Sequence, residues 1–271
     1  MPTTNRPTDP RISVVIPAKN EAKNLPWVLE RIPDETYELI LVDGDSTDDT
    51  VAVATAIRRD MKVVGQFAPG KGAALAAGLL SATGDIVVMI DADCSMDPRE
   101  IPTFVDALVA GADMVKGSRY LDGAGSEDLT PLRNAGNWCL SVSANLLHRT
   151  KWSELCYGFA AMWTDVLDPL DILQVALPPM YDPQVADVTH RRSGRRPRSY
   201  GHGFEIEALL FCRASRTGLQ VVEVPSHERE RMHGVSNLLT FRDGVRVLSA
   251  VLRERSRPAS RRAPSVVGVA E

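Results

Sequence analysis

Short apolar runs alternate with amphipathic stretches through the first 117 residues of the chain. The apolar runs are rich in β-branched residues and predict five strands, at residues 12–17, 38–43, 61–66, 85–91 and 112–117. The amphipathic stretches predict helices around residues 21–31, 48–59, 71–82 and 98–110, and Ser46 or Thr47 is expected to cap the second of them. Strands that alternate with helices in this way predict an α/β fold with a mostly parallel, doubly wound sheet.

Acidic and polar segments follow three of the predicted strands. "PAKNE" follows the first strand, "DGDSTDD" lies at the second and "DADCS" at the fourth. Ligands of doubly wound sheets bind outside the carboxyl ends of the strands, so these segments predict a binding site at that edge. Asp91 and Asp93 lie one residue apart where an apolar run ends, and their charges repel unless a positive group lies between or beside them.

Composition and charge narrow the class of protein. The chain has 271 residues, of which 44% are hydrophobic and 24% charged, as in an ordinary soluble globular protein. The net charge of −4 argues against a dedicated nucleic-acid binder, although residues 190–198 and 253–262 are locally basic. No apolar run approaches the roughly 18 residues of a membrane span, and the N-terminus lacks a signal sequence, so a cytoplasmic protein is expected. The four cysteines form no C-x-x-C pair, so neither a zinc site nor a disulfide framework is indicated.

One nucleotide-binding motif is incomplete in the sequence, and another is absent after the first predicted strand. "GQFAPGKG" (65–72) matches most of a phosphate-binding P-loop, but Gly72 stands where that motif requires Ser or Thr. No G-x-G-x-x-G segment follows the first predicted strand, which disfavours a dinucleotide-dependent oxidoreductase. Lys71, in a glycine loop at the start of a helix, still suits an anionic phosphate group.

Several segments together resemble one enzyme family. In order they are "VVIPAKNEAKNL", "LVDGDSTDDT", "GKGAALAAG", "VVMIDADCSMDP", "GSRY", "CYGF", "GFEIE" and "RMHGVSN". Their order and spacing resemble family 2 glycosyltransferases over roughly residues 11 to 250, and most of all the branch of dolichol-phosphate mannose synthases and related polyprenyl-phosphate sugar synthases. The resemblance implies a GT-A fold, a nucleotide-diphosphate sugar donor and a divalent cation, Mg²⁺ or Mn²⁺.

The resemblance also implies a donor site. Asp91 and Asp93, on either side of Ala92, would hold the metal against the donor diphosphate, and Asp93 and Arg231 would act in catalysis. Ser95 stands where relatives often have Gln, so the third protein ligand stays open, and His233 is a candidate for it. The expected nucleotide contacts are Pro17, Ala18, Asn20, Glu21, Asp43, Asp45 and Lys71, of which Asp45 could equally be a turn residue.

The acceptor site is implied by a second group of residues. Arg119, Arg133 and Asn137 correspond to the acceptor-phosphate clamp of the polyprenyl-phosphate branch, and paired guanidinium groups suit a phosphate. A phosphate nucleophile is already ionised, whereas a hydroxyl acceptor needs a base, for which Glu154 is the candidate. Glu205 and Glu207 in "GFEIE" resemble family residues but also fit an edge strand or a helix start.

The predicted function is therefore metal-dependent, inverting transfer of a hexose from a nucleotide-diphosphate sugar to a polyprenyl phosphate. The first alternative is transfer to a soluble hydroxyl acceptor. The others are that the protein is a sugar nucleotidyltransferase or a non-catalytic nucleotide-sugar binder. One domain is expected over residues 11–255, with a nucleotide-sugar half (11–117) and an acceptor half (118–255). Residues 1–10 and 256–271 are expected to be disordered, and residues 168–200 to form a loop or lid. The amphipathic stretch near 237–255 predicts a terminal helix packed on the domain, or else a helix in peripheral contact with the inner face of a membrane.

Overall fold

A seven-stranded, mostly parallel sheet forms the centre of the molecule. The computed structural model describes residues 6–176, 200–235 and 238–256. The sheet has the order β3-β2-β1-β4-β7-β5-β8, and every neighbouring pair is parallel except the two pairs that β7 makes. The strands are β1 (Ile12–Ala18), β2 (Glu38–Asp43), β3 (Lys62–Gly65), β4 (Ile86–Met89), β5 (Met114–Ser118), β7 (Ala160–Trp163) and β8 (Val221–Pro225). The five strands expected from the apolar runs are therefore confirmed, and so is the parallel sheet.

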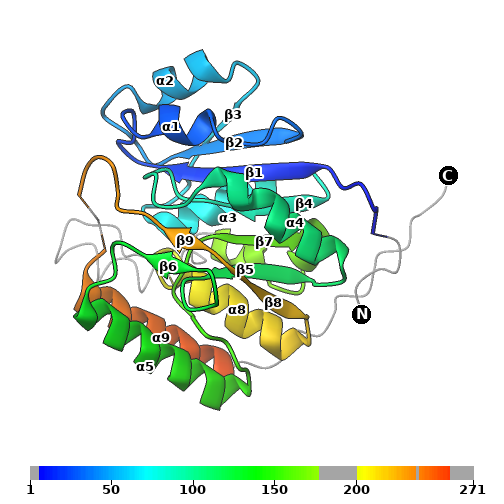
Figure 1. The fold of residues 1–271 in the computed structure, drawn as a ribbon, viewed down its shortest axis with the longest axis vertical. Coiled ribbons are helices and arrows are strands. Elements are labelled where there is room, and N and C mark those ends of the chain that lie inside the picture. The colour runs from blue at the N-terminus through cyan, green and yellow to red at the C-terminus, as the bar shows by residue number, and fades with distance from the viewer. Residues whose placement is uncertain (1–5, 177–199, 236–237, 257–271) are drawn as a thin grey trace, which may run out of the picture.

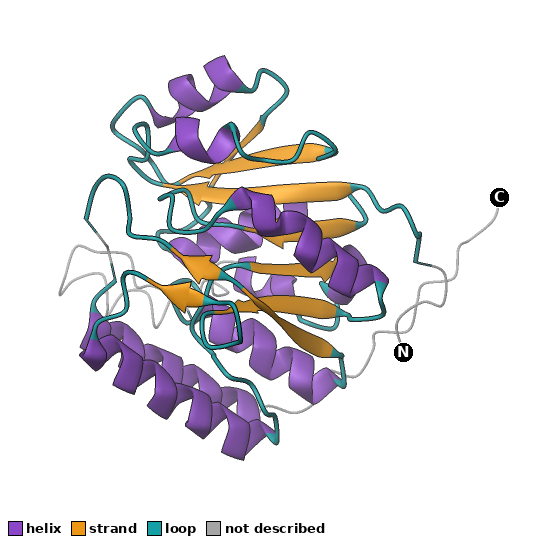
Figure 2. Cartoon of the chain, viewed as in Figure 1, coloured by secondary structure: helices purple, strands orange, loops and turns teal. Residues whose placement is uncertain are grey.

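Helices flank this sheet on both sides (Figures 1 and 2). They are α1 (Leu25–Leu29), α2 (Thr50–Ile57), α3 (Lys71–Ser81), α4 (Ile101–Val109), α5 (Pro131–His148), α6 (Ile172–Ala176), α8 (Ile206–Thr217) and α9 (Thr240–Ser256). Single 3₁₀ turns lie at Pro98–Glu100 and Thr164–Val166, and a two-stranded ribbon joins β6 (Gly125–Ser126) to β9 (His227–Glu228). Helix α3 packs on β1 and β2, whereas α4 packs on β5 and β7, so a different helix packs on each half of the sheet.

The start of α2 differs from the prediction that Ser46 or Thr47 caps it. The helix begins at Thr50, and the residue before it, Asp49, makes no capping bond with its side chain. The Ser46 hydroxyl instead accepts a hydrogen bond from the backbone N–H of Asn20 (2.9 Å), and the N–H of Thr47 donates to the Asn20 side chain (2.7 Å). The two residues join the loop after β2 to the loop after β1, which keeps them out of the helix.

Helix α9 packs against the domain, as expected for a terminal helix. It lies beside α5 and α8, and it buries Val247, Ala250 and Val251. The carboxylate of Glu254 is fully buried and pairs with Arg213 and Arg216 of α8. Within the described ranges, none of the helices combines the length and apolarity that crossing a bilayer requires.

Part of the sequence prediction concerns residues outside the described ranges. These are residues 1–5, most of the expected loop or lid (177–199, with the basic run 190–198), the end of the "RMHGVSN" segment (236–237), and the tail from residue 257. The beginning of the expected lid, residues 168–176, forms a turn followed by α6.

The first turn of α3 is held against the segment 201–203. The backbone N–H of Gly72 donates to the carbonyl oxygen of His202 (3.0 Å), and a Cβ atom at residue 72 would lie 1.9 Å from the carbonyl oxygen of Gly201. A side chain larger than hydrogen cannot fit there unless the backbone moves. This close approach fixes the position of Lys71, the first residue of α3.

We expect Gly72→Ala to lower the free energy of unfolding by roughly 1–3 kcal/mol, the usual cost of overpacking. Gly136→Ala is the control, because a Cβ atom at that α5 position meets nothing within 4 Å. It should raise the free energy of unfolding by about 0.5–1 kcal/mol, since Ala is the better helix former. Equilibrium urea denaturation measures both changes, and equal midpoints for Gly72→Ala and the parent chain would contradict the prediction.

Candidate active site

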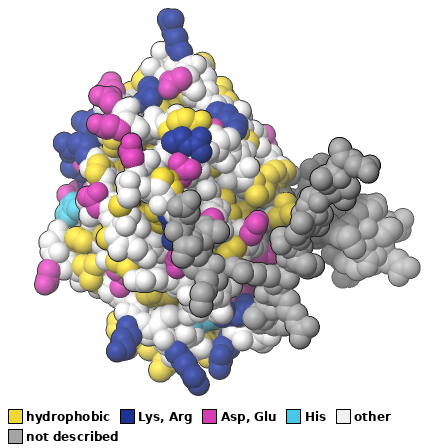
Figure 3. Space-filling view, turned by 90° about the vertical axis from the view of Figure 1, so that its right-hand side faces the viewer, with side chains coloured by type: hydrophobic (Ala, Val, Ile, Leu, Met, Phe, Trp, Pro, Cys, Tyr) yellow, Lys and Arg dark blue, Asp and Glu magenta, His cyan; other side chains and the backbone are white. Residues whose placement is uncertain are grey.

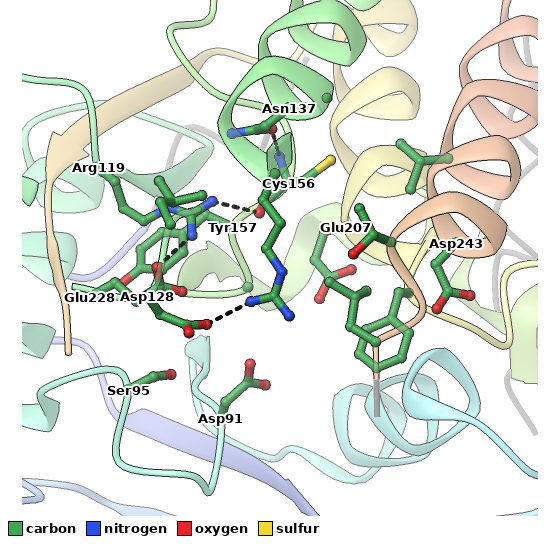
Figure 4. A pocket seen from close by; sticks show the side chains of 18 of the residues that line it. Asp91, Ser95, Arg119, Asp128, Asn137, Cys156, Tyr157, Glu207, Glu228 and Asp243 are labelled. Carbon is green, nitrogen blue, oxygen red and sulfur yellow. Dashed lines mark hydrogen bonds and ion pairs between the residues drawn. The ribbon is translucent and has the colours of Figure 1, made fainter. Parts of the chain in front are cut away.

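A cavity of about 250 Å³ lies where the strand ends meet α5 and α9. Asp91 and Asp93 enter it from the segment after β4, and Arg119 from the segment after β5. Arg133 and Asn137 reach it from α5, and Phe204, Glu207 and residues of α9 complete the lining. Figure 4 shows Asp91, Arg119, Asn137, Glu207 and Asp243 around it. The cavity thus brings together the two aspartates predicted to bind the metal and the predicted acceptor residues Arg119, Arg133 and Asn137.

Lys71 is ion-paired with two carboxylates at one side of the cavity. Its ammonium nitrogen lies 2.7 Å from Oδ1 of Asp91 and 2.9 Å from Oε1 of Glu207. Burial would lower the pKa of Lys71, but the two carboxylates outweigh it and raise the pKa above its usual range. Burial raises the pKa of Glu207 despite the pairing with Lys71. Lys71 is therefore a fixed cation next to the metal-binding carboxylate that the sequence predicted.

Arg231 takes the corresponding place beside Asp93. Its guanidinium donates to Oδ2 of Asp93 (2.5 Å) and to Oε1 of Glu21 (3.2 Å). The hydroxyl of Ser95 donates to Oδ1 of Asp93 (2.6 Å). Burial raises the pKa of Glu21, against the opposing effects of the Asn24 amide and of Arg231. Ser95 orients the Asp93 carboxylate through this bond.

The charge of the lining fits a divalent cation. Six carboxylates and four cationic side chains line the cavity, which leaves a formal charge of −2. Carboxylate oxygens are the ligands that Mg²⁺ and Mn²⁺ prefer, and Asp91 and Asp93 both present them to the cavity. Among the residues that the structure describes, no three His, Cys, Asp or Glu side chains gather as a metal site. The exposed His233 does not line the cavity, so it is not brought together with the two aspartates.

Apart from Lys71, which lines the cavity, the predicted nucleotide contacts lie at and just after the ends of β1 and β2, outside the cavity lining. Pro17 and Ala18 end β1, and Asn20 follows in the left-handed conformation (φ 59°), bonded to Ser46 and Thr47. One oxygen of Asp43 is buried without a hydrogen-bond partner, so it can accept a bond from a ligand. Asp45 also has a positive φ (57°), which agrees with the turn alternative. Ala92 is buried between Asp91 and Asp93.

Arg119 is already neutralised by protein carboxylates. It pairs with Glu154 through both oxygens and with Glu228 at 2.6 Å, and its guanidinium lies 4.8 Å from the centre of the Tyr157 ring. Burial alone would lower the pKa of Arg119, but its bonds with Glu154 and Glu228 raise it. The amide of Asn137 also donates to Glu154 (2.8 Å). Glu154 is fully buried behind Arg119 and Asn137 and does not line the cavity.

Arg133 is the more accessible of the two predicted clamp arginines. Its side chain is 26% exposed, against 8% for Arg119, and its partner Asp128 is 51% exposed (2.9 Å). Thr130 caps α5 by accepting a bond from the backbone N–H of Arg133. A half-exposed ion pair contributes little to stability, so Arg133 can exchange Asp128 for a ligand at low cost.

Several lining residues were not assigned from the sequence. Asp128, Glu228 and Asp243 add carboxylates, and an apolar wall consists of Leu129, Leu140, Leu238 and Val247. Glu207 was weighed only as a family-like residue or a helix start, and it is in the first turn of α8. The one signal in the sequence that could have marked it is a carboxylate flanked by the apolar residues Ile206 and Ala208–Phe211.

Comparisons with known proteins identify the family of the chain. Residues 13–170 match the family described as Glycosyl transferase family 2. A polyprenol monophosphomannose synthase from Mycolicibacterium smegmatis is 32% identical over 251 residues, which cover 88% of this chain and 84% of that protein. An undecaprenyl-phosphate mannosyltransferase from Micrococcus luteus is 27% identical, over 84% and 87% of the two chains.

Two further matches complete the comparison. An uncharacterized glycosyltransferase from Mycobacterium tuberculosis is 47% identical over 108 residues, and the match spans about half (48%) of its length and 40% of this chain. Glucosyl-3-phosphoglycerate synthase from Mycobacterium tuberculosis, solved with Mn²⁺, UDP and phosphoglyceric acid, superposes with a TM-score of 0.63 and 25% identity, over 93% of this chain and 80% of that one. With the sheet, the aspartate pair and the family match in agreement, the chain belongs to glycosyltransferase family 2 and is an enzyme with the GT-A fold.

Proposed function

We propose that this enzyme transfers a hexose from a nucleotide-diphosphate sugar to the phosphate of a polyprenyl phosphate, with a divalent cation and with inversion at the sugar carbon. The observation that carries the proposal is the single cavity, which has carboxylates and their paired cations at one end and an arginine with an apolar wall at the other. A charged donor and an amphipathic acceptor need these two environments side by side. The names of the relatives from Mycolicibacterium smegmatis and Micrococcus luteus support the same acceptor class.

Asp91 and Asp93 would hold the cation at the donor end. When bound, Mg²⁺ or Mn²⁺ neutralises the charge that develops on the leaving nucleotide diphosphate. Lys71 and Arg231 lie against the same carboxylates and can donate to the diphosphate oxygens. The unpartnered oxygen of Asp43 would accept a bond from the base or ribose. Mn²⁺ and UDP in the structure of the synthase from Mycobacterium tuberculosis support this arrangement of the donor.

At the acceptor end, the geometry favours an acceptor that needs no base. Glu154, the base candidate for a hydroxyl acceptor, is buried and spends both oxygens on Arg119 and Asn137. It therefore positions Arg119 and does not reach a substrate. Arg133 is free to exchange its exposed partner for a phosphate, and the neighbouring leucines suit the first carbons of a lipid chain.

A soluble acceptor is the second candidate. The synthase from Mycobacterium tuberculosis was solved with phosphoglyceric acid, which carries both a phosphate and a hydroxyl group. Arg133 could hold such a phosphate as well. In that case a lining carboxylate, such as Asp128 or Glu228, would have to accept the proton from the hydroxyl nucleophile.

We expect Asp91→Asn and Asp93→Asn to lower kcat on the order of 10³-fold, because metal assistance supplies several kcal/mol of transition-state stabilisation. Chelation should abolish transfer by the parent enzyme, and added Mn²⁺ or Mg²⁺ should restore it. Asp106→Asn, on the exposed side of α4, is the control and should leave kcat unchanged. Initial rates with a panel of nucleotide sugars measure this, and parent-like turnover of Asp93→Asn in chelator would count against the metal.

We expect the product to have the opposite anomeric configuration to the donor. In the proposed arrangement donor and acceptor share the cavity, so the acceptor would displace the nucleotide directly, without a covalent sugar–enzyme intermediate. Proton NMR of the product reports the configuration through the coupling constant of the anomeric proton. Retention of the donor's configuration would rule out direct displacement.

We expect Arg133→Met to lower kcat/KM for a polyprenyl phosphate by about 10- to 100-fold, the scale of a charge-assisted hydrogen bond. Arg59→Met, at an exposed position of the loop after α2, is the matched control. Glu154→Gln should cost less than Arg133→Met and should leave the pH profile of kcat unchanged, since Glu154 carries no reacting proton. A general base would instead cost about 10²–10⁴-fold in kcat and remove the acidic limb of the profile, and that result would favour the hydroxyl acceptor.

A further inference from the structure

Helix α5 has an apolar outer side. Its buried residues, among them Asn137, Ser141 and Ala144, lie on the side facing the domain. Leu132 and Leu146 lie on the opposite side and are 59% and 77% exposed. The sequence from Asn134 to Leu147 contains no charged residue. An uncharged, outward-facing helix side of this length is unusual on a soluble domain.

Helix α9 has two apolar sides. Val247 and Val251 face inward and pack against the domain. Phe241, Val245, Leu248 and Leu252 follow each other at spacings of four, three and four residues, so they form one stripe on the helix surface. All four are exposed, Phe241 by 77%. One apolar side explains the packing of α9 on the domain, and the outer stripe is left without a partner among the described residues.

The two outer sides form one surface, because α5 and α9 lie side by side at the edge of the molecule (Figure 1). We name it the α5–α9 face and define it by Leu132, Leu146, Phe241, Val245, Leu248 and Leu252. The two helices carry seven of the 18 large hydrophobic side chains that are exposed in the described part of the chain. The clustering separates this face from the scattered exposed residues of an ordinary surface.

The exposed charged side chains that α5 and α9 themselves carry are basic, although the loop before α5 contributes the exposed Asp128 as the partner of Arg133. The exposed charged residues of α9 are Arg242, Arg253 and Arg255, whereas its two acids, Asp243 and Glu254, are buried. Helix α5 contains no acid. Lys and Arg side chains gather at the lower end of the molecule in Figure 3. Since the whole chain has a net charge of −4, this basic border is a local feature and not a general property of the surface.

We propose that the α5–α9 face docks on an anionic lipid bilayer. Apolar residues enter the boundary between headgroups and acyl chains, and the arginines at the border contact lipid phosphates. A second copy of the chain would bring two arginine borders against each other, so charge complementarity favours the lipid. The cavity is lined by Leu140 and Val247 of the same helices, on their inner sides.

The proposal deepens the proposed function, on which its account of the acceptor rests. A polyprenyl phosphate in the bilayer would enter between α5 and α9, and its phosphate would reach Arg133 in the first turn of α5. The lipid chain would keep contact with the bilayer during the reaction. Docking itself requires only the face and can be measured without any substrate.

Flotation of the full chain with vesicles tests the docking. It should float with vesicles of phosphatidylcholine and phosphatidylglycerol (1:1), and much less with phosphatidylcholine alone or at high salt. Phe241→Glu/Leu252→Glu should weaken the partition coefficient by at least about tenfold, because both changes remove apolar area and repel the lipid. Leu80→Glu/Val109→Glu is the matched control, since it changes two exposed apolar positions at helix ends elsewhere. It should bind like the parent chain.

Fluorescence tests the same contact without disturbing the face. Trp138 of α5 is 65% exposed, and lipids brominated on the acyl chain should quench its emission. Trp138→Phe should remove most of that quenching. Absence of flotation, or equal flotation of the two double variants, would overturn the proposal. So would a dimer in sedimentation velocity that Phe241→Glu/Leu252→Glu converts to a monomer, if neither form binds vesicles.

Transfer assays separate this proposal from the proposed function. Phe241→Glu/Leu252→Glu should use a short-chain isoprenyl phosphate in solution like the parent enzyme, and lose at least about tenfold with a long-chain one in vesicles. Vesicle binding without transfer to either phosphate would contradict the proposed acceptor and leave the docking face standing. Transfer to both without vesicle binding would contradict the docking face alone.

Discussion

Two cations hold four carboxylates together at the donor end of the cavity, and much of the site depends on this balance. Lys71 joins Asp91 to Glu207, and Arg231 joins Asp93 to Glu21. These pairs connect the ends of β1 and β4 to the starts of α3 and α8 and to the segment after β9. Four acids against two cations still leave two negative charges, and Asp93 and Asp91 add to the raised pKa values of Glu21 and Glu207. The proposed divalent cation would balance these two negative charges.

The two arginines at the proposed acceptor end differ in burial, and this difference decides which of them can bind a ligand. Arg119 lies among Glu154, Glu228 and Tyr157, and breaking such a buried network would leave charges unpaired. Arg133 has a single exposed partner at the first turn of α5. The first is thus part of the framework and the second is available to a ligand. In sequence both are simply arginines of motifs fourteen residues apart, so this division became visible only in three dimensions.

The same limit explains what the sequence predicted and what it could not. The first five strands follow from short β-branched runs, because strands buried on both faces need apolar residues at every position. Strand β7, which is four residues long and contains two alanines, carries no such pattern, and its antiparallel place between β4 and β5 depends on contacts distant in the chain. The interpretation of Glu154 as a base came from its local motif. Its pairing with Arg119, 35 residues away, depends on the fold.

Helix α9 shows a related ambiguity. Its sequence is amphipathic, which predicted a packed helix or a membrane-bound one as alternatives. The structure shows that one apolar side can pack while another stays exposed, so the two alternatives do not exclude each other. Helix α5 repeats this arrangement, with Asn137 toward Glu154 and Leu146 toward the outside. A helix that contacts the proposed acceptor site on one side and presents leucines on the other would place that site within a helix diameter, ~10 Å, of whatever the outer side contacts. The position of α5 and α9 therefore links the choice of acceptor to the surface on which the enzyme works.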